Sequence, residues 1–590
     1  MPELPAKGSI RSALIVIIAS GYLLLTACAG VGGGSGNAMP TQSSSVAQSD
    51  STVPEEPTSG LADVETSGPT VVSASPDLTD DHSLVIAEPP VEPRPITQGE
   101  QILTMPGPGA IPQTLDPALI RDASASFIAR QVFRGLVQLN DALDVTPAIA
   151  ERVEASRDGM TYTFTLRANA VFHDGSSIDA SAVKASFERA TDPDLADGDG
   201  FSLSSAIYMN DIVGVEERLA GNAGDISGIE VVNDTTVVMR LTQPSANFLY
   251  KLTGTAAQVV DVRTTTVDGW WMNPNGSGPF ELSEIEDDVL TLTSFGEFYA
   301  GEPPLEEVRM LLGSAAASPL NLYEAGEVDL TDVPFYAVDR VLSESDPLNA
   351  DLVMVEQLST SFVLLNPNLE PFDDIELRRA IALGFDREKV ARVMLDGKVR
   401  VADGILPPGM LGREWPATYP PYDVDAAAAI IERIGQPETE PAFYDSGVAV
   451  ALKQVLEQNL GLQTEAISLE WPEFSSRLTQ QSMPAFNLSW IADFPDPANF
   501  MNSMFYSQSP DNYIGYHNAE MDRLLQTAET EPDENERVSL YLAAQQLAID
   551  DAVLIPLYHD VSYTVIKPSV NGVVVSPIGL LSLERAWIER

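Results

Sequence analysis

Alternating apolar and polar side chains predict several strands in this chain. The clearest run is 161–166, with the sequence Thr-Tyr-Thr-Phe-Thr-Leu, and similar alternation covers 235–241 and 289–292. A period of two residues places every second side chain on one face of a sheet, as in a half-buried strand. A continuous apolar run also predicts a strand over 553–558.

Helical spacing of apolar residues predicts a long helix over 374–395. Asp373 or Asp374 is a candidate N-cap, and Asp396-Gly397 is a candidate stop. One buried face is then expected to carry Ile375, Ile381, Leu383, Phe385, Val390, Val393 and Met394.

A second helix is predicted over 533–550, directly after Pro532 and before the strand at 553–558. Strands and helices therefore occur together along one long chain, and no repeat of about 20–50 residues indicates a solenoid. This mixture indicates a layered α/β fold.

The N-terminal segment has the pattern of an export signal. Lys7 and Arg11 precede an apolar run over 13–25, and the sequence Leu-Thr-Ala-Cys then ends at Cys28. This run is short of the roughly 20 residues that a membrane-spanning helix needs, so a cleaved signal is favoured. The tetrapeptide also resembles the lipobox of bacterial lipoproteins. We predict a signal peptide at 1–27 and lipidation of Cys28; the alternative is a soluble secreted protein with a buried cysteine.

Residues 28–100 have the composition of a tether. The stretch from Ala29 to Glu100 is rich in Gly, Ser, Thr and Pro, and it holds eleven acidic residues against a single basic one, Arg94. Without a sustained apolar period, such a segment cannot bury enough surface to offset its ordering entropy. We predict a disordered acidic tether between the lipid anchor and a folded body.

Composition narrows the class of protein. A chain of 590 residues with 44% apolar and 20% charged residues is long enough for two or three domains. The net charge of −53 argues against nucleic acid as a partner, and one cysteine excludes an internal disulfide. Residues 1–27 contribute +1 and residues 28–100 contribute −10, which leaves −44 on the folded body. This acidity favours cationic or zwitterionic ligands.

No motif supplies catalytic or metal chemistry. The four histidines, at positions 82, 173, 517 and 559, are far apart and form no His-Glu-x-x-His pattern. A phosphate-binding loop is also missing from the sequence, and Ser277 lacks the glycine two residues before it that a nucleophile elbow requires. We predict a protein that is not an enzyme and needs no cofactor or metal. A hydrolase built on carboxylate pairs remains the alternative, because such pairs cannot be recognised in so acidic a chain.

Eight short blocks occur in a characteristic order in the folded body. They are Thr-Leu-Asp-Pro at 114–117 and the blocks at 132–137, 147–151, 158–167, 171–175, 276–280, 371–381 and 490–497. With these blocks the chain resembles the family-5 extracellular solute-binding proteins, the dipeptide, oligopeptide and nickel receptors of ABC importers. The resemblance covers essentially all of 101–590.

The resemblance implies the two-lobe α/β fold of periplasmic binding proteins, with an extra small subdomain on lobe one. Two hinge crossings are expected near 358–365 and 554–565. Lobe one then comprises 101–356 plus 566–590, and lobe two comprises 357–565. Ligand is expected between the lobes and is enclosed when they close.

The block Trp-Ile-Ala-Asp at 490–493 carries the main site prediction. In peptide-binding relatives the aspartate at the place of Asp493 pairs with the α-ammonium of the ligand. The alternative is that Asp493 only caps the next helix or forms a turn. Asp496 is a weaker candidate because it lies between two prolines, and Trp490 is either a wall of the site or part of the core.

Other binding residues follow from the same resemblance. The backbone of Ser489 and Ile491 is expected to pair with the ligand main chain as an added strand. Arg477 is a candidate for a ligand carboxylate, although a surface arginine on the preceding helix is the simpler interpretation. The loop that holds Arg121 and Asp122 is expected to face the ligand from lobe one.

Together these features predict a receptor that captures short peptides and delivers them to the permease and ATPase subunits of an ABC importer. We expect a monomer, lipid-anchored on the outer face of the plasma membrane, or in the periplasm where two membranes exist. Alternatives with the same fold bind a glycan, a nickel chelate or an opine. A further alternative is a scaffold or regulator of the cell envelope that has no transport role.

Overall fold

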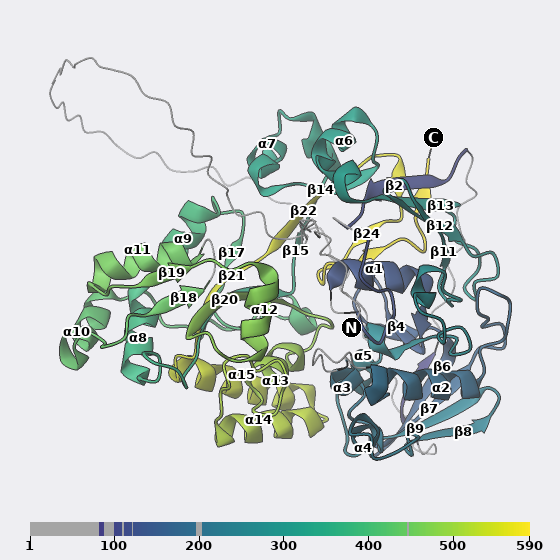
Figure 1. Ribbon diagram of the computed structural model, residues 1–590, viewed down its shortest axis with the longest axis horizontal. Coiled ribbons are helices and arrows are strands. Elements are labelled where there is room, and N and C mark those ends of the chain that lie inside the picture. Colours follow the sequence, from purple (N-terminus) through teal and green to yellow (C-terminus); the bar gives the residue numbers. More distant parts are fainter. Residues whose placement is uncertain are drawn as a thin grey trace, which may run out of the picture. The chain divides into compact units, whose positions relative to one another are not determined.

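In the computed structural model the chain folds into two α/β lobes (Figure 1). The predicted signal peptide, Cys28 and Arg121 lie outside the residues that the structure describes. Described residues are 82–87, 99–108, 111–120, 122–195, 203, 205–444 and 448–589. Among them, no helix has the length and apolar content that a membrane crossing requires.

Lobe two is built on a six-stranded sheet. Its central strand β16 is buried along its whole length and is antiparallel to a neighbour on each side. The strands, in spatial order, are β17 (Arg400–Val401), β21 (Leu554–His559), β16 (Ser359–Leu365), β20 (Ala485–Ile491), β18 (Ala442–Tyr444) and β19 (Glu465–Ile467).

Alternation along β16 divides lobe two into two cores. Phe362 and Leu364 belong to a cluster with α13, α14 and α15, whereas Val363 and Leu365 belong to a cluster with α8, α10 and α11. Both faces of the sheet are therefore covered by helices, which explains why neither face of β16 is exposed. The helices are α8 (Ile375–Gly384), α9 (Arg387–Met394), α10 (Val424–Ile434), α11 (Val448–Leu460), α12 (Trp471–Thr479), α13 (Ala498–Phe505), α14 (Ala519–Thr530) and α15 (Glu534–Asp550).

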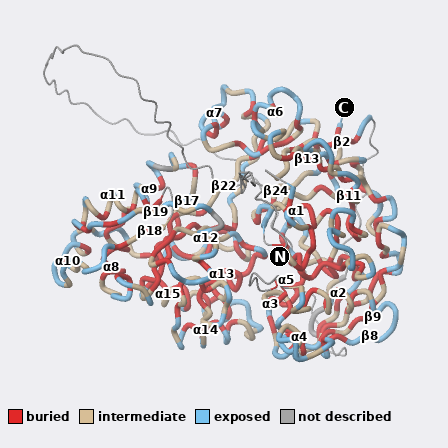
Figure 2. The backbone as a smooth tube through the Cα atoms, in the orientation of Figure 1, coloured by how far each residue is buried: buried red, intermediate tan, exposed pale blue. Residues whose placement is uncertain are grey.

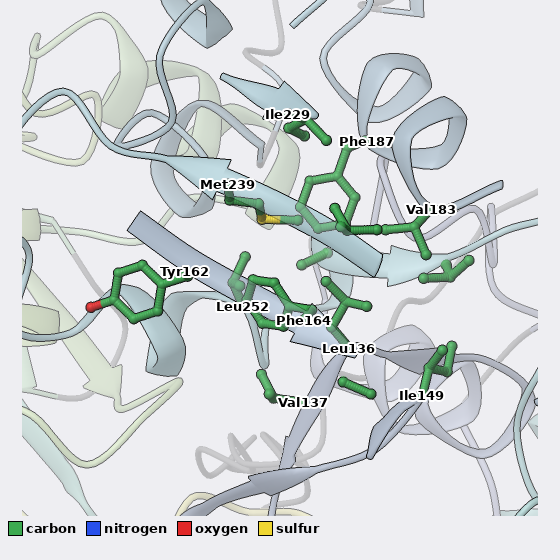
Figure 3. Packing of buried hydrophobic residues seen from close by; sticks show 14 of the residues in the cluster. Leu136, Val137, Ile149, Tyr162, Phe164, Val183, Phe187, Ile229, Met239 and Leu252 are labelled. Carbon is green, nitrogen blue, oxygen red and sulfur yellow. The ribbon is translucent and has the colours of Figure 1, made fainter. Parts of the chain in front are cut away.

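Lobe one contains an antiparallel five-stranded sheet and a mixed four-stranded sheet. The first has the order β1 (His82–Ala87), β6 (Ala150–Ser156), β7 (Thr161–Leu166), β9 (Thr236–Arg240) and β8 (Ile229–Asn233). The second has the order β11 (Phe280–Glu286), β12 (Val289–Ser294), β13 (Glu307–Leu311) and β2 (Ile102–Pro106). Tyr162 and Phe164 of β7 pack in one core with Phe187 of α2 (Ala180–Ala190), as Figure 3 shows.

A three-stranded sheet lies where the chain passes between the lobes. Its order is β14 (Leu330–Asp332), β22 (Val561–Ile566) and β15 (Leu352–Glu356). The chain leaves β15 and enters β16 of lobe two within two residues, and it returns from β21 to β22 across Asp560. These are two adjacent crossings, near the expected positions. The lobe boundaries themselves stay predictions.

Shorter elements complete the described chain. The helices are α1 (Ala123–Val132), α3 (Ser205–Tyr208), α4 (Val215–Leu219), α5 (Phe248–Lys251), α6 (Pro319–Ala325) and α7 (Val338–Leu342). The strands are β3 (Arg134–Gly135), β4 (Val137–Leu139), β5 (Val145–Pro147), β10 (Gln258–Val259), β23 (Val570–Asn571), β24 (Val574–Val575), β25 (Leu581–Ser582) and β26 (Trp587–Ile588). Figure 2 shows buried positions concentrated inside each lobe, with exposed positions on outer helices such as α10 and α14.

The strands predicted from alternation are confirmed. The run 161–166 is β7, and the other two alternating runs are β9 and β12. The strand expected at 553–558 is β21, and the helix expected at 533–550 is α15, with Asp533 as its N-cap.

The single helix predicted over 374–395 is wrong, because the structure has two helices there. Asp374 caps α8 as predicted, but the backbone of Phe385 is extended, with φ −101° and ψ 110°. Asp386 then starts α9 by accepting a 2.9 Å hydrogen bond from the Lys389 amide. The change of direction leaves Val393, expected to be buried, 66% exposed.

The predicted tether is also interrupted by structure. Residues 82–87 form β1, which pairs antiparallel with β6 and places Ile86 opposite Val153. Ile86 packs on the core of the five-stranded sheet, so a short apolar run gains burial that a free tether would not have. The disordered segment predicted over 28–100 is therefore wrong for these six residues.

Candidate functional site

The loop between β20 and α13 holds the predicted site residue Asp493. Its side chain is exposed, and its Oδ2 accepts hydrogen bonds from the Tyr208 hydroxyl at 2.8 Å and from the Asn499 amide at 3.2 Å. The Asn499 Oδ1 accepts the Asp493 backbone N–H at 3.2 Å. Asn499 on α13 thus fixes both the backbone and the carboxylate of this residue.

Trp490 is oriented by the same asparagine. Its indole Nε1 donates to Asn499 Oδ1 at 2.9 Å, and the half-buried ring packs on the core of lobe two. The indole is therefore both part of the core and a rigid neighbour of the Asp493 loop.

Within the described part of the chain, one edge of β20 has no strand partner beside this loop. From Ser489 to Ile491 the strand pairs with β16, whereas β18 reaches only Ala485 and Phe486 on the other side. No other strand of the described residues continues that edge. An extended ligand has backbone partners available here, as expected for β-strand addition.

Tyr208 comes from α3 of lobe one and was missed by the sequence analysis. Burial, and then the negative charge of Asp493, raise the pKa of Tyr208 well above its usual range, so the hydroxyl stays a protonated donor. The two residues are 285 positions apart in the chain. No local motif marks Tyr208, and only the fold brings it to Asp493.

Arg130, on α1, adds a positive charge near Asp493. Its Nη1 donates to the Thr253 carbonyl at 3.0 Å. Burial lowers the pKa of the Arg130 guanidinium, and the Asp493 carboxylate opposes this fall. The site therefore combines a carboxylate, a phenol and a guanidinium.

Further contacts join the same parts of the two lobes. The rings of Tyr250 and Phe494 stack with centroids 6.0 Å apart. Lys251 Nζ lies 3.0 Å from Asp211 Oδ2 and 3.0 Å from Glu529 Oε1 on α14. Burial alone lowers the pKa of Lys251, but the two carboxylates outweigh it and raise the pKa. This charged triad is a buried link between lobe one and lobe two.

Two predicted binding residues have other partners in this structure. Arg477 on α12 pairs with Glu473, with Nη2 and Oε1 2.8 Å apart, and its guanidinium lies 5.6 Å from the ring centre of Tyr444. This is the arrangement of a surface arginine on a helix. Asp122 caps α1, since its Oδ1 accepts the Ala125 amide at 2.8 Å. Their roles toward a ligand stay predictions.

A cavity of about 520 Å³ also includes Arg130 in its lining. Residues around the C-terminal part of α1 form one side, and the segment 572–587 forms another. Among the described residues, no group of three or more His, Cys, Asp or Glu side chains is placed to hold a metal ion.

Comparison with known proteins identifies the relatives of this fold. The oligopeptide-binding protein OppAIV of Borrelia burgdorferi superposes with a TM-score of 0.72 at 22% identity, covering 83% of this chain and all of that one. The dipeptide-binding protein DppE of Bacillus subtilis is 25% identical over 84% of this chain and 93% of its own length. YgiS of Escherichia coli, a probable deoxycholate-binding periplasmic protein, is 28% identical over 78% of this chain and 88% of its own length.

The predicted resemblance and the two-lobe fold are both confirmed. Residues 144–512 match the bacterial extracellular solute-binding proteins, family 5 middle, and this segment is more than half of the chain. The chain belongs to the family-5 extracellular solute-binding proteins.

Proposed function

We propose that this protein captures short peptides outside the cytoplasm and delivers them to the permease of an ABC importer. The observation that carries the proposal is the exposed Asp493 carboxylate, held beside Tyr208 at the open edge of β20. Relatives described as dipeptide- and oligopeptide-binding proteins support this ligand class.

Asp493 supplies the charge that selects a free N-terminus. Its two hydrogen-bond donors, the Tyr208 hydroxyl and the Asn499 amide, are neutral, so neither forms an ion pair that would compete with a ligand cation. A charge-assisted hydrogen bond to an α-ammonium contributes about 1.5–3 kcal/mol. Backbone hydrogen bonds along β20 then hold the following residues without selecting their side chains.

Closure of the lobes is the step that commits the ligand. The buried Lys251–Glu529 pair joins lobe one to α14, and we propose that this pair forms when the lobes close. Ligand bound at Asp493 of lobe two, whose carboxylate accepts the Tyr208 hydroxyl of lobe one, shifts the population toward this arrangement. No bond is made or broken, and the protein acts as a receptor rather than an enzyme.

Thermal melting tests the ligand class. A mixed library of di- to pentapeptides at about 100 times Kd is expected to stabilise the protein by about 2.7 kcal/mol, whereas sugars, opines and nickel chelates have no effect. At the same peptide concentration the stabilisation should fall to about 0.3–1.4 kcal/mol in Asp493→Asn, as a roughly 10- to 150-fold loss of affinity requires. It should persist in full in Glu432→Gln, which alters an exposed carboxylate on α10. Stabilisation by another ligand class alone, or by none, contradicts peptide capture.

Mass spectrometry tests the alternative that the protein is a hydrolase. The recovered peptides should be uncleaved; cleaved products would indicate a hydrolase.

The proposal includes attachment to the membrane through Cys28. Acyl chains on this residue contribute about 0.8 kcal/mol per buried CH₂ group, enough for stable anchoring with two or more chains. Cys28→Ser is expected to move the protein from the membrane fraction to the soluble fraction and to remove metabolic labelling with palmitate. An unchanged membrane fraction without label would show another mode of attachment.

A further inference from the structure

A short segment of lobe one makes direct contacts with lobe two. This docking segment, residues 245–251, comprises α5 and the turn that leads into it. The Ala246 N–H donates to the Glu529 carbonyl at 3.1 Å, and Lys251 Nζ lies 3.0 Å from Glu529 Oε1. Glu529 of α14 is therefore bound twice by the same segment, once through its backbone and once through its side chain.

The same segment also makes a ring contact with lobe two. Tyr250 stacks on Phe494, with an angle of 18° between the ring planes. Phe494 is buried and directly follows Asp493 in the chain. The docking segment therefore contacts both the end of α14 and the loop that holds the proposed ammonium site.

The end of α14 suits the two donors of the docking segment. Glu529 lies in the last turn of the helix, where backbone carbonyls have no partner within the helix. The amide four residues further on, that of Asp533, donates instead to Glu531 Oε1 at 2.9 Å. The negative end of the helix dipole also favours a cation such as the Lys251 ammonium. A backbone N–H and an ammonium are therefore the partners that this helix end lacks on its own.

Lobe one holds its part of the contact in place without lobe two. Lys251 Nζ lies 3.0 Å from Asp211 Oδ2, and the Ser245 hydroxyl donates to the same oxygen at 3.1 Å. All three residues are buried and belong to lobe one. Because Lys251 keeps Asp211 as its partner, separation from Glu529 leaves no buried charge alone. The contact can therefore form and break while each lobe keeps its own fold.

We infer that Glu529 and the docking segment form a latch that holds the lobes together and thereby sets the affinity for peptide. This inference rests on the proposed peptide function. A ligand that binds only the closed form has an apparent Kd that rises as the closed fraction falls. Glu529 is therefore a positioning residue, which acts through the equilibrium between open and closed lobes rather than by contact with the peptide.

Hydrogen exchange in the absence of peptide tests the latch. Glu529→Gln removes the charge but keeps the carbonyl that accepts the Ala246 N–H, so faster exchange of this amide reports separation of the lobes. We expect an increase of about tenfold, with no change in β16 at the core of lobe two. Tyr250→Leu keeps every charge and should act in the same direction. Glu536→Gln, at an exposed carboxylate of α15, is the matched control and should leave the Ala246 amide unchanged.

Peptide release is the second measurement. For the library peptide that stabilises the protein most, the dissociation rate should rise about three- to tenfold in Glu529→Gln and Tyr250→Leu but not in Glu536→Gln. Unchanged Ala246 exchange, or faster exchange with unchanged release, would overturn the latch; peptide capture stays intact if Asp493→Asn still lowers affinity. Absence of stabilisation by every peptide would instead overturn the proposed function, and exchange of the Ala246 amide would still decide whether the lobes are latched.

Discussion

Asp493 and Asp496 lie three residues apart in one loop and have opposite environments. Asp493 is exposed, and the side-chain groups that donate hydrogen bonds to it are a hydroxyl and an amide. Asp496 is 0% exposed, forms an ion pair with Arg537 of α15, and accepts the Ala498 amide at 2.9 Å through Oδ1. Two aspartates three residues apart therefore differ in their partners: the hydrogen-bond donors of Asp493 are neutral, whereas Asp496 forms an ion pair.

The difference shows how a loop assigns structure and recognition to separate residues. The charge of Asp496 is neutralised by the buried Arg537 guanidinium, and this ion pair holds the loop against α15. The Asp496 carboxylate is therefore not available to a ligand. The charge of Asp493 is met by neutral hydrogen-bond donors and stays available to a cation. Burial of one carboxylate thus positions the other.

The largest expected effect is the loss of stability when the buried Asp496–Arg537 ion pair is broken. Arg537→Met leaves the Asp496 carboxylate buried without its partner, which should lower the free energy of unfolding by about 3–5 kcal/mol. Urea denaturation measures this loss. The matched change Arg523→Met removes an exposed ion pair, with Glu520, and should cost no more than about 1 kcal/mol. Equal losses of unfolding free energy in Arg537→Met and Arg523→Met would show that burial does not raise the cost of removing an ion-pair partner.

Acid should destabilise the protein through the buried His559. Burial lowers the pKa of His559 to about 4 from its ordinary value of 6.5. The unfolded chain takes up this proton first, so stability is complete above pH 6.5 and falls by roughly 3 kcal/mol as the pH decreases to about 4. The free energy of unfolding of His559→Gln should vary less over this interval. An unchanged pH profile in the variant would assign the acid sensitivity to other groups.

The sequence predicts elements well where a period is local. The alternation at 161–166 coincides with β7, because each apolar side chain there faces the core. The break after α8 escaped prediction because Phe385 is buried, so the apolar spacing continues across a backbone that is no longer helical. Hydrophobic periodicity reports burial, and it does not report every change of chain direction.

The site is less predictable because it depends on contacts between distant segments. The position of Asp493 followed from a resemblance over a contiguous motif, whereas Tyr208 has no motif and reaches Asp493 only through the fold. Pairing of Arg477 with Glu473 was foreseeable as a helical i,i+4 contact. A ligand role for Arg477 is not decided by that spacing.

Asp493→Asn should separate recognition from stability. The variant keeps the size of the side chain and loses its charge, so peptide affinity is expected to fall by about 10- to 150-fold. The free energy of unfolding should change by no more than about 0.5 kcal/mol, because the residue is exposed. Calorimetry and urea denaturation on the same preparation measure both. A large loss of stability with unchanged peptide affinity would show that Asp493, like Asp496, stabilises the loop and does not bind the ligand.

Tyr208→Phe should give the smallest effect. It tests whether the Tyr208 hydroxyl contributes to peptide binding through its hydrogen bond to Asp493. The variant keeps the ring and removes the hydroxyl that donates to Oδ2 at 2.8 Å, so peptide affinity should fall by about three- to tenfold. Tyr336→Phe, a change at a 73% exposed tyrosine, is the matched control and should have no effect. Because the hydroxyl acts through the carboxylate, its loss should add little in the Asp493→Asn background. Additive losses in the double variant would mean that Tyr208 contacts the ligand independently of Asp493. The hydrogen bond from its hydroxyl would then not explain how Asp493 binds a cation.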